Sequence, residues 1–307
     1  MSFTRRAVGG PGGKFQRLEE RTVLKRFLRK LRGSQPNELP GYTPMGIVRE
    51  GSMSSIIKAK DQKTGQIVAV KVHKPGARKA VDKLEAQYRD FTEGQITAAF
   101  DHPNVVKCYD HGTLGETPYL VLEYLEGVTL GNLMAGDSTR LEGQRLAFVR
   151  QAAAGLEHVH SRRFVHHDFC PKNLFVTTQN QVKVIDFGLA TPLLDKPTTG
   201  TRMGTIETLA PEVLRREPCD YRVDVFAWGV VAYQVLSGHW PFESPEHHQA
   251  LSKILNVHAV PLDKRTPGLP EDISQLVMRA IAKSPAKRLN SMTTAVGVLE
   301  RFKDASL

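Results

Sequence analysis

The sequence lacks the features that mark secreted, disulfide-stabilised and membrane-spanning proteins. Only three of its 307 residues are cysteines, Cys108, Cys170 and Cys219, and no two of them form a C-x-x-C pair. This spacing suits neither a disulfide framework nor a structural zinc site, so it indicates a reducing compartment. The longest mostly apolar run, Val225 to Leu236, is far shorter than the roughly 20 residues of a membrane span. The N-terminus also lacks the apolar stretch of a secretory signal, so we expect a cytoplasmic protein without a membrane span.

Positive charge is concentrated at the N-terminus. The net charge is +10, and residues 1–40 carry ten Lys or Arg against three Glu, a net of +7. Nucleic-acid binding favours a basic face on the folded domain rather than a basic tail, so we expect no nucleic-acid partner. Between Phe15 and Leu31 the apolar residues recur at helical spacing among basic ones. This amphipathic helix would dock on the folded body or, alternatively, use residues 15–32 to touch a membrane surface or partner.

The main body, residues 41–303, has strand patterns first and helical patterns later. The strand-like segments are Ile56 to Ala59, Ile67 to Val72 and Tyr119 to Glu123, and the clearest helical ones are Gln144 to His160, Val223 to Ser237 and Ile273 to Ala282. This order is typical of an α+β protein in which a small sheet lobe precedes a larger helical lobe. We place the lobes at residues 41–124 and 125–303.

Several short motifs in this body carry chemistry. V-A-V-K ends at Lys71, F-V-H-H-D-F-C-P-K-N spans Phe164 to Asn173, and V-I-D-F-G spans Val184 to Gly188; G-T-I-E-T-L-A-P-E at Gly204 to Glu212, D-V-F-A-W-G at Asp224 to Gly229, and Arg288 follow. A single acid or lysine among them would be an ordinary surface residue. In this order, the segments together resemble the signature set of eukaryotic-like (Hanks-type) serine/threonine protein kinases, including the soluble bacterial ones.

The resemblance implies a bilobal protein-kinase fold with one helix in the sheet lobe, and transfer of the ATP γ-phosphoryl group to Ser or Thr hydroxyls of proteins. Lys71 would hold the α- and β-phosphates, and Glu93 would hold Lys71. We choose Glu93 over Glu85 because it stands ten residues before Pro103 of the D-H-P-N segment. Asp168 would be the base that accepts the hydroxyl proton.

Cofactor and substrate positions follow from the same resemblance. Asn173 and Asp186 would bind Mg²⁺, with Mn²⁺ as an alternative, since hard cations prefer oxygen ligands. Thr205, in the Gly-Thr pattern of serine/threonine kinases, would orient Asp168, and Arg288 would pair with Glu212. The remaining nucleotide-binding residues would be Val48, Gly51, Ile56 and Ala69, the gatekeeper Leu122, and the backbone of Glu123 and Leu125.

Two segments depart from the family pattern. The glycine-rich loop, V-R-E-G-S-M-S-S-I, keeps Gly51 but has Arg49 and Ser54 in place of the outer glycines. Because glycines let the backbone approach phosphates, we expect weaker or slower nucleotide handling rather than its loss. His167 replaces the Arg that receives the activation-loop phosphate. Activity should therefore not require phosphorylation of the threonines of that loop, Thr198, Thr199 and Thr201.

Cys170 replaces the catalytic-loop lysine that neutralises the γ-phosphoryl group. We expect Lys172, two residues later, to restore the charge and to disfavour basic residues before the phosphoacceptor; a solvated surface lysine is the alternative. Cys170 itself is either a reactive thiol or, as we favour, an inert small residue. His160 and His166 are interpreted as structural residues of the loop rather than metal ligands.

Two other functions remain open. A pseudokinase, which would use the fold as a nucleotide-binding scaffold or regulator, is suggested by Arg49, Ser54 and Cys170. A small-molecule phosphotransferase is opposed by Glu212 and Arg288, which belong to a peptide-docking region.

Overall fold

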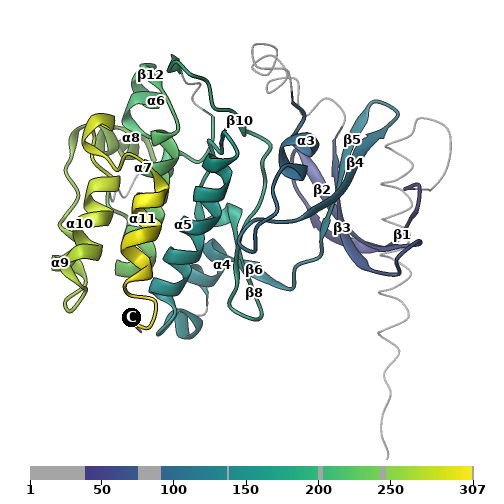
Figure 1. Cartoon of the computed structure of the whole chain (residues 1–307), viewed down its shortest axis with the longest axis horizontal. Helices are drawn as coiled ribbons and strands as arrows, with labels where there is room; N and C mark the ends of the chain where they lie inside the picture. Colours follow the sequence, from purple (N-terminus) through teal and green to yellow (C-terminus); the bar gives the residue numbers. More distant parts are fainter. Residues whose placement is uncertain (1–38, 75–90, 137, 200–202, 243–246, 306–307) are drawn as a thin grey trace, which may run out of the picture. The chain divides into compact units, whose positions relative to one another are not determined.

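Alternating apolar residues build an antiparallel sheet. In the computed structural model, which describes residues 39–74, 91–136, 138–199, 203–242 and 247–305, five strands pair in the order β1-β2-β3-β5-β4 (Figure 1). These strands are β1 (Tyr42–Glu50), β2 (Ser54–Asp61), β3 (Ile67–His73), β4 (Cys108–Leu114) and β5 (Thr117–Glu123). Because side chains alternate between the faces of a strand, every second residue enters the core. The core side chains that are at most 1% exposed are Leu39, Ile57, Ala59, Val68, Val70, Val72 and Val121.

The described residues divide into two compact units, each of which is described by itself. Residues 39–74 and 109–124 form the first unit, and residues 91–108 and 125–305 form the second. The segment 91–108, which we expected in the sheet lobe, thus groups with the helical residues. The limits 1–40 and 41–303 remain predictions.

The second unit is mainly helical (Figure 1). Its helices are α3 (Glu93–Ala98), α4 (Leu130–Ala135), α5 (Arg145–Ser161), α6 (Pro211–Arg215), α7 (Arg222–Ser237), α8 (His247–Asn256), α9 (Leu262–Arg265), α10 (Glu271–Ala280) and α11 (Met292–Glu300). Helix α7 is apolar almost all round and is buried, as such helices are. At Gly229 a Cβ would lie 2.7 Å from the Cβ of Ala280, so only glycine allows α7 and α10 to approach this closely.

Short strands and 3₁₀ turns position the loops of the second unit. One small sheet has the order β6-β8-β9, and two further ladders pair β7 with β10 and β11 with β12. The strands are β6 (Gly127–Thr129), β7 (Phe164–Val165), β8 (Leu174–Thr177), β9 (Val182–Val184), β10 (Thr191–Pro192), β11 (Thr198–Thr199) and β12 (Pro218–Cys219). The 3₁₀ turns are η1 (Ser138–Leu141), η2 (Pro171–Asn173), η3 (Ile206–Thr208) and η4 (Pro285–Lys287).

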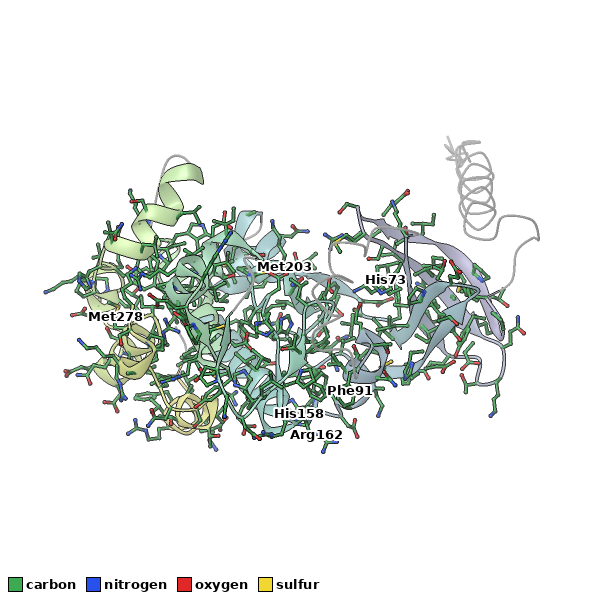
Figure 2. All side chains as sticks on the ribbon, turned by 90° about the horizontal axis from the view of Figure 1, so that it is seen from above. His73, Phe91, His158, Arg162, Met203 and Met278 are labelled. Atoms are coloured by element: carbon green, nitrogen blue, oxygen red, sulfur yellow. The ribbon has the colours of Figure 1, made fainter. Side chains whose placement is uncertain are left out.

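Aromatic contacts join the residues on either side of α3 to β7, and a hydrogen bond joins the end of α3 to the residue that follows α5. The ring of Phe164 meets Phe91 edge-on at 5.8 Å and Phe100 at 5.6 Å between centroids. The Nε of Arg162 donates to the carbonyl of Ala99, which ends α3, at 3.2 Å. Figure 2 labels Phe91 and Arg162 within this group. The first residue of α3, Glu93, is therefore held within the second unit.

The α+β fold is confirmed, and all six clearest segments lie in elements of the expected type. The strand segments fall in β2, β3 and β5, and the helical ones fall largely in α5, α7 and α10. Strands β1 and β4 were missed. β1 contains Pro44 and Gly46 and has two register shifts, which break its alternation. The basic helix expected over residues 15–31 lies outside the described residues.

Candidate active site

A buried carboxylate anchors the loop that contains Asp168. Asp224, in the first turn of α7, is 1% exposed. It accepts hydrogen bonds from the backbone N–H of His166 at 2.7 Å and of His167 at 2.9 Å, and lies 2.9 Å from Nε2 of His160. Burial alone would raise the pKa of this carboxyl, but the hydrogen bond from His160 and the nearby imidazoles hold the pKa at about 2. An ionised Asp224 thus fixes the loop backbone.

Two residues of the sequence motifs, His167 and Asp186, adopt left-handed backbone conformations. His167 has φ 64° and Asp186 has φ 65°. This conformation costs a non-glycine residue about 1–2 kcal/mol, so surrounding contacts must maintain it. Gly204, with φ 105°, faces the same loop, and a Cβ there would lie 2.9 Å from the carbonyl oxygen of His167. Glycine is therefore required where this segment passes the loop.

Three donors hold the carboxylate of Asp168. Its Oδ1 accepts from the backbone N–H of Thr205 at 2.8 Å and from the Thr205 hydroxyl at 2.9 Å. Its Oδ2 accepts from Nδ2 of Asn173 at 2.8 Å. The structure thus brings three of the predicted site residues, Asp168, Asn173 and Thr205, into contact, and the role of Thr205 in orienting Asp168 stays a prediction.

Asn173 and Asp186 lie at the same end of a hairpin. Strands β8 and β9 pair antiparallel with Leu174 opposite Val184, and Asn173 precedes β8 whereas Asp186 follows β9. The N–H of Ile185 donates to the carbonyl of Asn173 at 2.9 Å, which extends the ladder to the two candidate ligands.

Glu93 approaches the segment that contains Asp186. The N–H of Gly188 donates to Oδ1 of Asp186 at 3.3 Å. A Cβ on Gly188 would lie 3.3 Å from that oxygen and 3.5 Å from Oε2 of Glu93. Both carboxylates therefore flank Gly188, and Glu93 is 4% exposed. Phe187, between Asp186 and Gly188, packs on Phe100 with ring centroids 4.7 Å apart.

The predicted pair of Glu212 and Arg288 is confirmed. The guanidinium binds both carboxylate oxygens, with Nη1 to Oε1 at 2.6 Å and Nη2 to Oε2 at 2.7 Å, and the two side chains are 2% and 0% exposed. Arg288 also donates to the carbonyls of Ala282 and Arg222. This pair joins α6 to the start of α7 and to the segment before α11.

The residues that depart from the family pattern have distinct surroundings. His167 places Nε2 2.9 Å from the hydroxyl of Thr191, and burial lowers the pKa of its imidazole. Cys170 is 1% exposed, and burial and the charge of Asp168 raise the pKa of its thiol to about 11. A buried, protonated thiol is a poor nucleophile. Lys172 is exposed on η2.

In the first unit, four of the predicted nucleotide residues, Ile56, Ala69, Lys71 and Leu122, share the face of the sheet opposite its core. Ile56 pairs with Lys71, and Ala69 pairs with Leu122. Val48, 54% exposed, lies at a register shift beside Ile47. Lys71 is on this face and is 6% exposed, whereas Glu93 belongs to the other unit.

The loop after β1 explains the single retained glycine, Gly51. Its N–H donates to the carbonyl of Ser54 at 2.8 Å, and a Cβ there would lie 3.2 Å from that oxygen. The hairpin between β1 and β2 is therefore tight at this position.

The two residues whose backbone was expected to bind adenine lie at the boundary between the units. Glu123 is the last residue of β5, and Leu125 is the first residue after β5 that belongs to the second unit.

Sequence reasoning missed the role of Asp224. The residue was recognised only as the start of a helical motif. An acid that begins a long apolar run, Val225 to Leu236, is a signal of a buried charge, and buried charges need partners. His160 and His166 are structural residues, as predicted: His160 contacts Asp224, and Nδ1 of His166 accepts from the N–H of Asp168 at 3.2 Å.

Comparison with known proteins identifies the family. The family model described as "Protein kinase domain" matches residues 42–297. The chain belongs to the protein kinase family. The kinase match begins with β1 and ends within α11, so it includes all the motifs described above.

Similar proteins are bacterial serine/threonine-protein kinases. The chain is 32% identical over 246 residues to PknB of Mycobacterium leprae, a match that covers 78% of this chain and 39% of the relative. It is 32% identical over 263 residues to PknB of Mycobacterium tuberculosis H37Rv, covering 82% and 41%, and 27% identical over 249 residues to PrkC of Bacillus subtilis, covering 80% and 38%. The chain thus spans about two fifths of the length of these relatives. Among the described residues of this kinase, no helix has the length and apolarity to cross a membrane.

Proposed function

We propose that this chain is a serine/threonine protein kinase that transfers the γ-phosphoryl group of ATP to Ser or Thr hydroxyls of proteins. The observation that carries the proposal is the Asp168 carboxylate, which three donors from Thr205 and Asn173 hold in one orientation. Phosphoryl transfer depends mainly on placement and electrostatics, so a rigidly held base is the feature that it needs.

Asp168 would accept the proton of the substrate hydroxyl. Each carboxylate oxygen can accept two hydrogen bonds. Oδ1 already has two donors from Thr205, whereas Oδ2 has one from Asn173. We therefore assign proton acceptance to Oδ2. The hydrogen bonds from the backbone of His166 and His167 to Asp224 support this role, because the loop that carries Asp168 does not have to reorganise during the reaction.

A divalent cation fits Asn173 and Asp186. Asn173 uses its amide nitrogen on Asp168, so its side-chain oxygen remains as a ligand atom, and Asp186 contributes a carboxylate from the same end of the hairpin. Oxygen ligands of this kind favour Mg²⁺, with Mn²⁺ as an alternative. When bound, the cation would neutralise phosphate oxygens. The left-handed backbone of Asp186 supports a functional reason for its placement.

The nucleotide would bind the face of the first unit's sheet that lies opposite its core. Val48, Ile56, Ala69 and Leu122 would contact the adenine, with backbone groups of Glu123 and Leu125 as hydrogen-bonding partners and Gly51 close to the phosphates. Lys71 would hold the α- and β-phosphates and Glu93 would hold Lys71. The common face of Ile56, Ala69, Lys71 and Leu122 supports this assignment.

Lys172 would supply the charge that Cys170 lacks. Lys172 directly precedes Asn173, the proposed metal ligand, in η2. Because its side chain is exposed, the ammonium group would be accessible to a phosphoryl group. A cation here would disfavour substrates with basic residues just before the phosphoacceptor.

The three cysteines, which form no disulfide among the described residues, support a cytoplasmic location.

A pseudokinase is the second candidate. The observation that favours it is the glycine-rich loop, in which Arg49 and Ser54 stand where the family has glycines. Larger residues there would keep the backbone farther from the phosphates. The held carboxylate of Asp168 favours the enzyme instead.

Incubation with γ-labelled ATP, magnesium and a generic Ser/Thr protein substrate tests the proposal. We expect label on Ser or Thr with the wild type and at least about 100-fold less with Asp168→Asn, since general-base catalysis contributes roughly 10²–10⁴. Nucleotide binding, measured by a fluorescent ATP analogue, should persist in Asp168→Asn. Binding without transfer in the wild type would support the pseudokinase instead.

A further inference from the structure

Arg163 occupies a backbone conformation that glycine would adopt without strain. It lies between α5 and β7 with φ 64°, in the left-handed region. An L residue with a long side chain is strained in this conformation. An arginine here therefore suggests that its side chain contributes something that glycine could not.

The guanidinium of Arg163 holds the segment that follows Asp186. Its Nη2 donates to Oδ1 of Asp195 at 2.7 Å and to the carbonyl of Leu193 at 3.4 Å. The carbonyl of Arg163 accepts from the N–H of Leu193 at 2.7 Å. Arg163 thus binds the segment through both its backbone and its charge. The paired side chains are exposed, Arg163 at 63% and Asp195 at 90%.

Neighbouring contacts also hold the same segment. Strand β10 pairs with β7, with Thr191 opposite Val165. The ring of His167 bonds to the hydroxyl of Thr191, and burial lowers the pKa of this imidazole, so it is largely neutral at pH 7. A neutral ring that already has a partner is a poor receptor for an anion. Further along, β11 pairs with β12 through Thr198 and Cys219.

We propose that Arg163 and Asp195 form a built-in charge clamp that positions the activation segment, in place of a phosphothreonine, and so supports docking of the protein substrate. The carboxylate of Asp195 supplies the anion and Arg163 supplies the cation. Both are positioning residues, since neither touches the reacting atoms. This inference rests on the proposed kinase function.

The variant Arg163→Gly tests the clamp because it removes the guanidinium and relieves the backbone strain at the same time. Thermal stability should stay equal or rise. The KM for a protein substrate should rise up to about fivefold at low salt, since exposed ion pairs contribute roughly 0.2–1 kcal/mol, a factor of about 1.4 to 5. The KM for ATP should not change, and the effect should shrink in 1 M salt, where charges are screened.

Arg216→Gly is the matched control. Arg216 is also an exposed arginine with φ 60°, and within the described part of the chain its guanidinium has no hydrogen bond or ion pair. We expect this variant to leave the KM for the protein substrate unchanged. The exchanged pair Arg163→Asp with Asp195→Arg should restore the wild-type KM, because Asp tolerates the left-handed region better than most residues.

The outcomes separate this inference from the proposed function. An inactive wild type would refute the kinase function itself. An active wild type whose KM for the protein substrate is the same in Arg163→Gly at low salt would refute the clamp. A large loss of activity on changing Thr198, Thr199 and Thr201 to Ala would also refute it, because a phosphate would then hold the segment. Thr201 lies outside the described residues.

Discussion

Removing the hydroxyl of Thr205 should slow phosphoryl transfer by about 10- to 30-fold. The carboxylate of Asp168 has three donors, and Thr205→Ala removes one of them while the backbone N–H of residue 205 remains. A hydrogen bond to a charged group contributes about 1.5–3 kcal/mol. Because Asp168 is partly exposed, we use the lower part of this range, about 1.5–2 kcal/mol, and each 1.36 kcal/mol corresponds to a tenfold change in rate.

The assay is steady-state transfer from labelled ATP to a Ser/Thr protein, with Thr205→Ser as the matched control. The serine variant keeps the hydroxyl, so we expect its kcat to stay within about twofold of the wild type. Nucleotide affinity should be the same in all three proteins, since Thr205 contacts Asp168 rather than the nucleotide face. A kcat for Thr205→Ala equal to that of Thr205→Ser would refute the orienting role of the hydroxyl.

Three further predictions test charge at separate places. Lys172→Ala should lower kcat by about tenfold and Lys172→Arg should keep it, because the transferring group needs a nearby cation; full activity of the alanine variant, measured by the same transfer assay, would show a solvated surface lysine. Glu212→Gln should lower the free energy of unfolding in urea by about 3–5 kcal/mol, since it leaves Arg288 buried without its carboxylate; a loss below 1 kcal/mol would contradict the pairing argument. Burial, with the charges of Arg215 and Arg288, lowers the pKa of Lys283 to about 7, so above pH 7 the unfolded chain binds more protons at this residue than the folded chain. The difference in the free energy of unfolding between the wild type and Lys283→Met, measured in urea, should therefore rise between pH 7 and pH 10. The rise should be less than about 1.4 kcal/mol per pH unit, because the side chain is partly exposed. A difference that falls with pH would show that the folded state favours the charged form of Lys283.

Motif positions predicted contacts both within one loop and between distant parts of the chain. Asp168 and Asn173 are five residues apart in one loop, so their spacing nearly fixes their geometry, and Thr205 was placed by its motif. The pair of Glu212 and Arg288 was also predicted from motif positions, although 76 residues separate them. These residues are recognisable because their chemistry restricts both residue type and position.

Other features had no sequence signal of comparable strength. The apolar run after Asp224 indicates that a helix is buried, but it does not indicate that the carboxylate accepts from the N–H groups of His166 and His167. Strand β4, C-Y-D-H-G-T-L, is too polar for its alternation to be visible. Arg163 occupies a left-handed position in which sequence rules expect glycine, so its pairing with Asp195 appears only in three dimensions.

A crystal structure with a non-hydrolysable ATP analogue and magnesium tests the central claim most directly. The account predicts the Nζ of Lys71 on the α- and β-phosphates, the side-chain oxygens of Asn173 and Asp186 on the metal, and Oδ2 of Asp168 facing the γ-phosphate. Phosphates bound elsewhere, or a metal that contacts neither Asn173 nor Asp186, would contradict it.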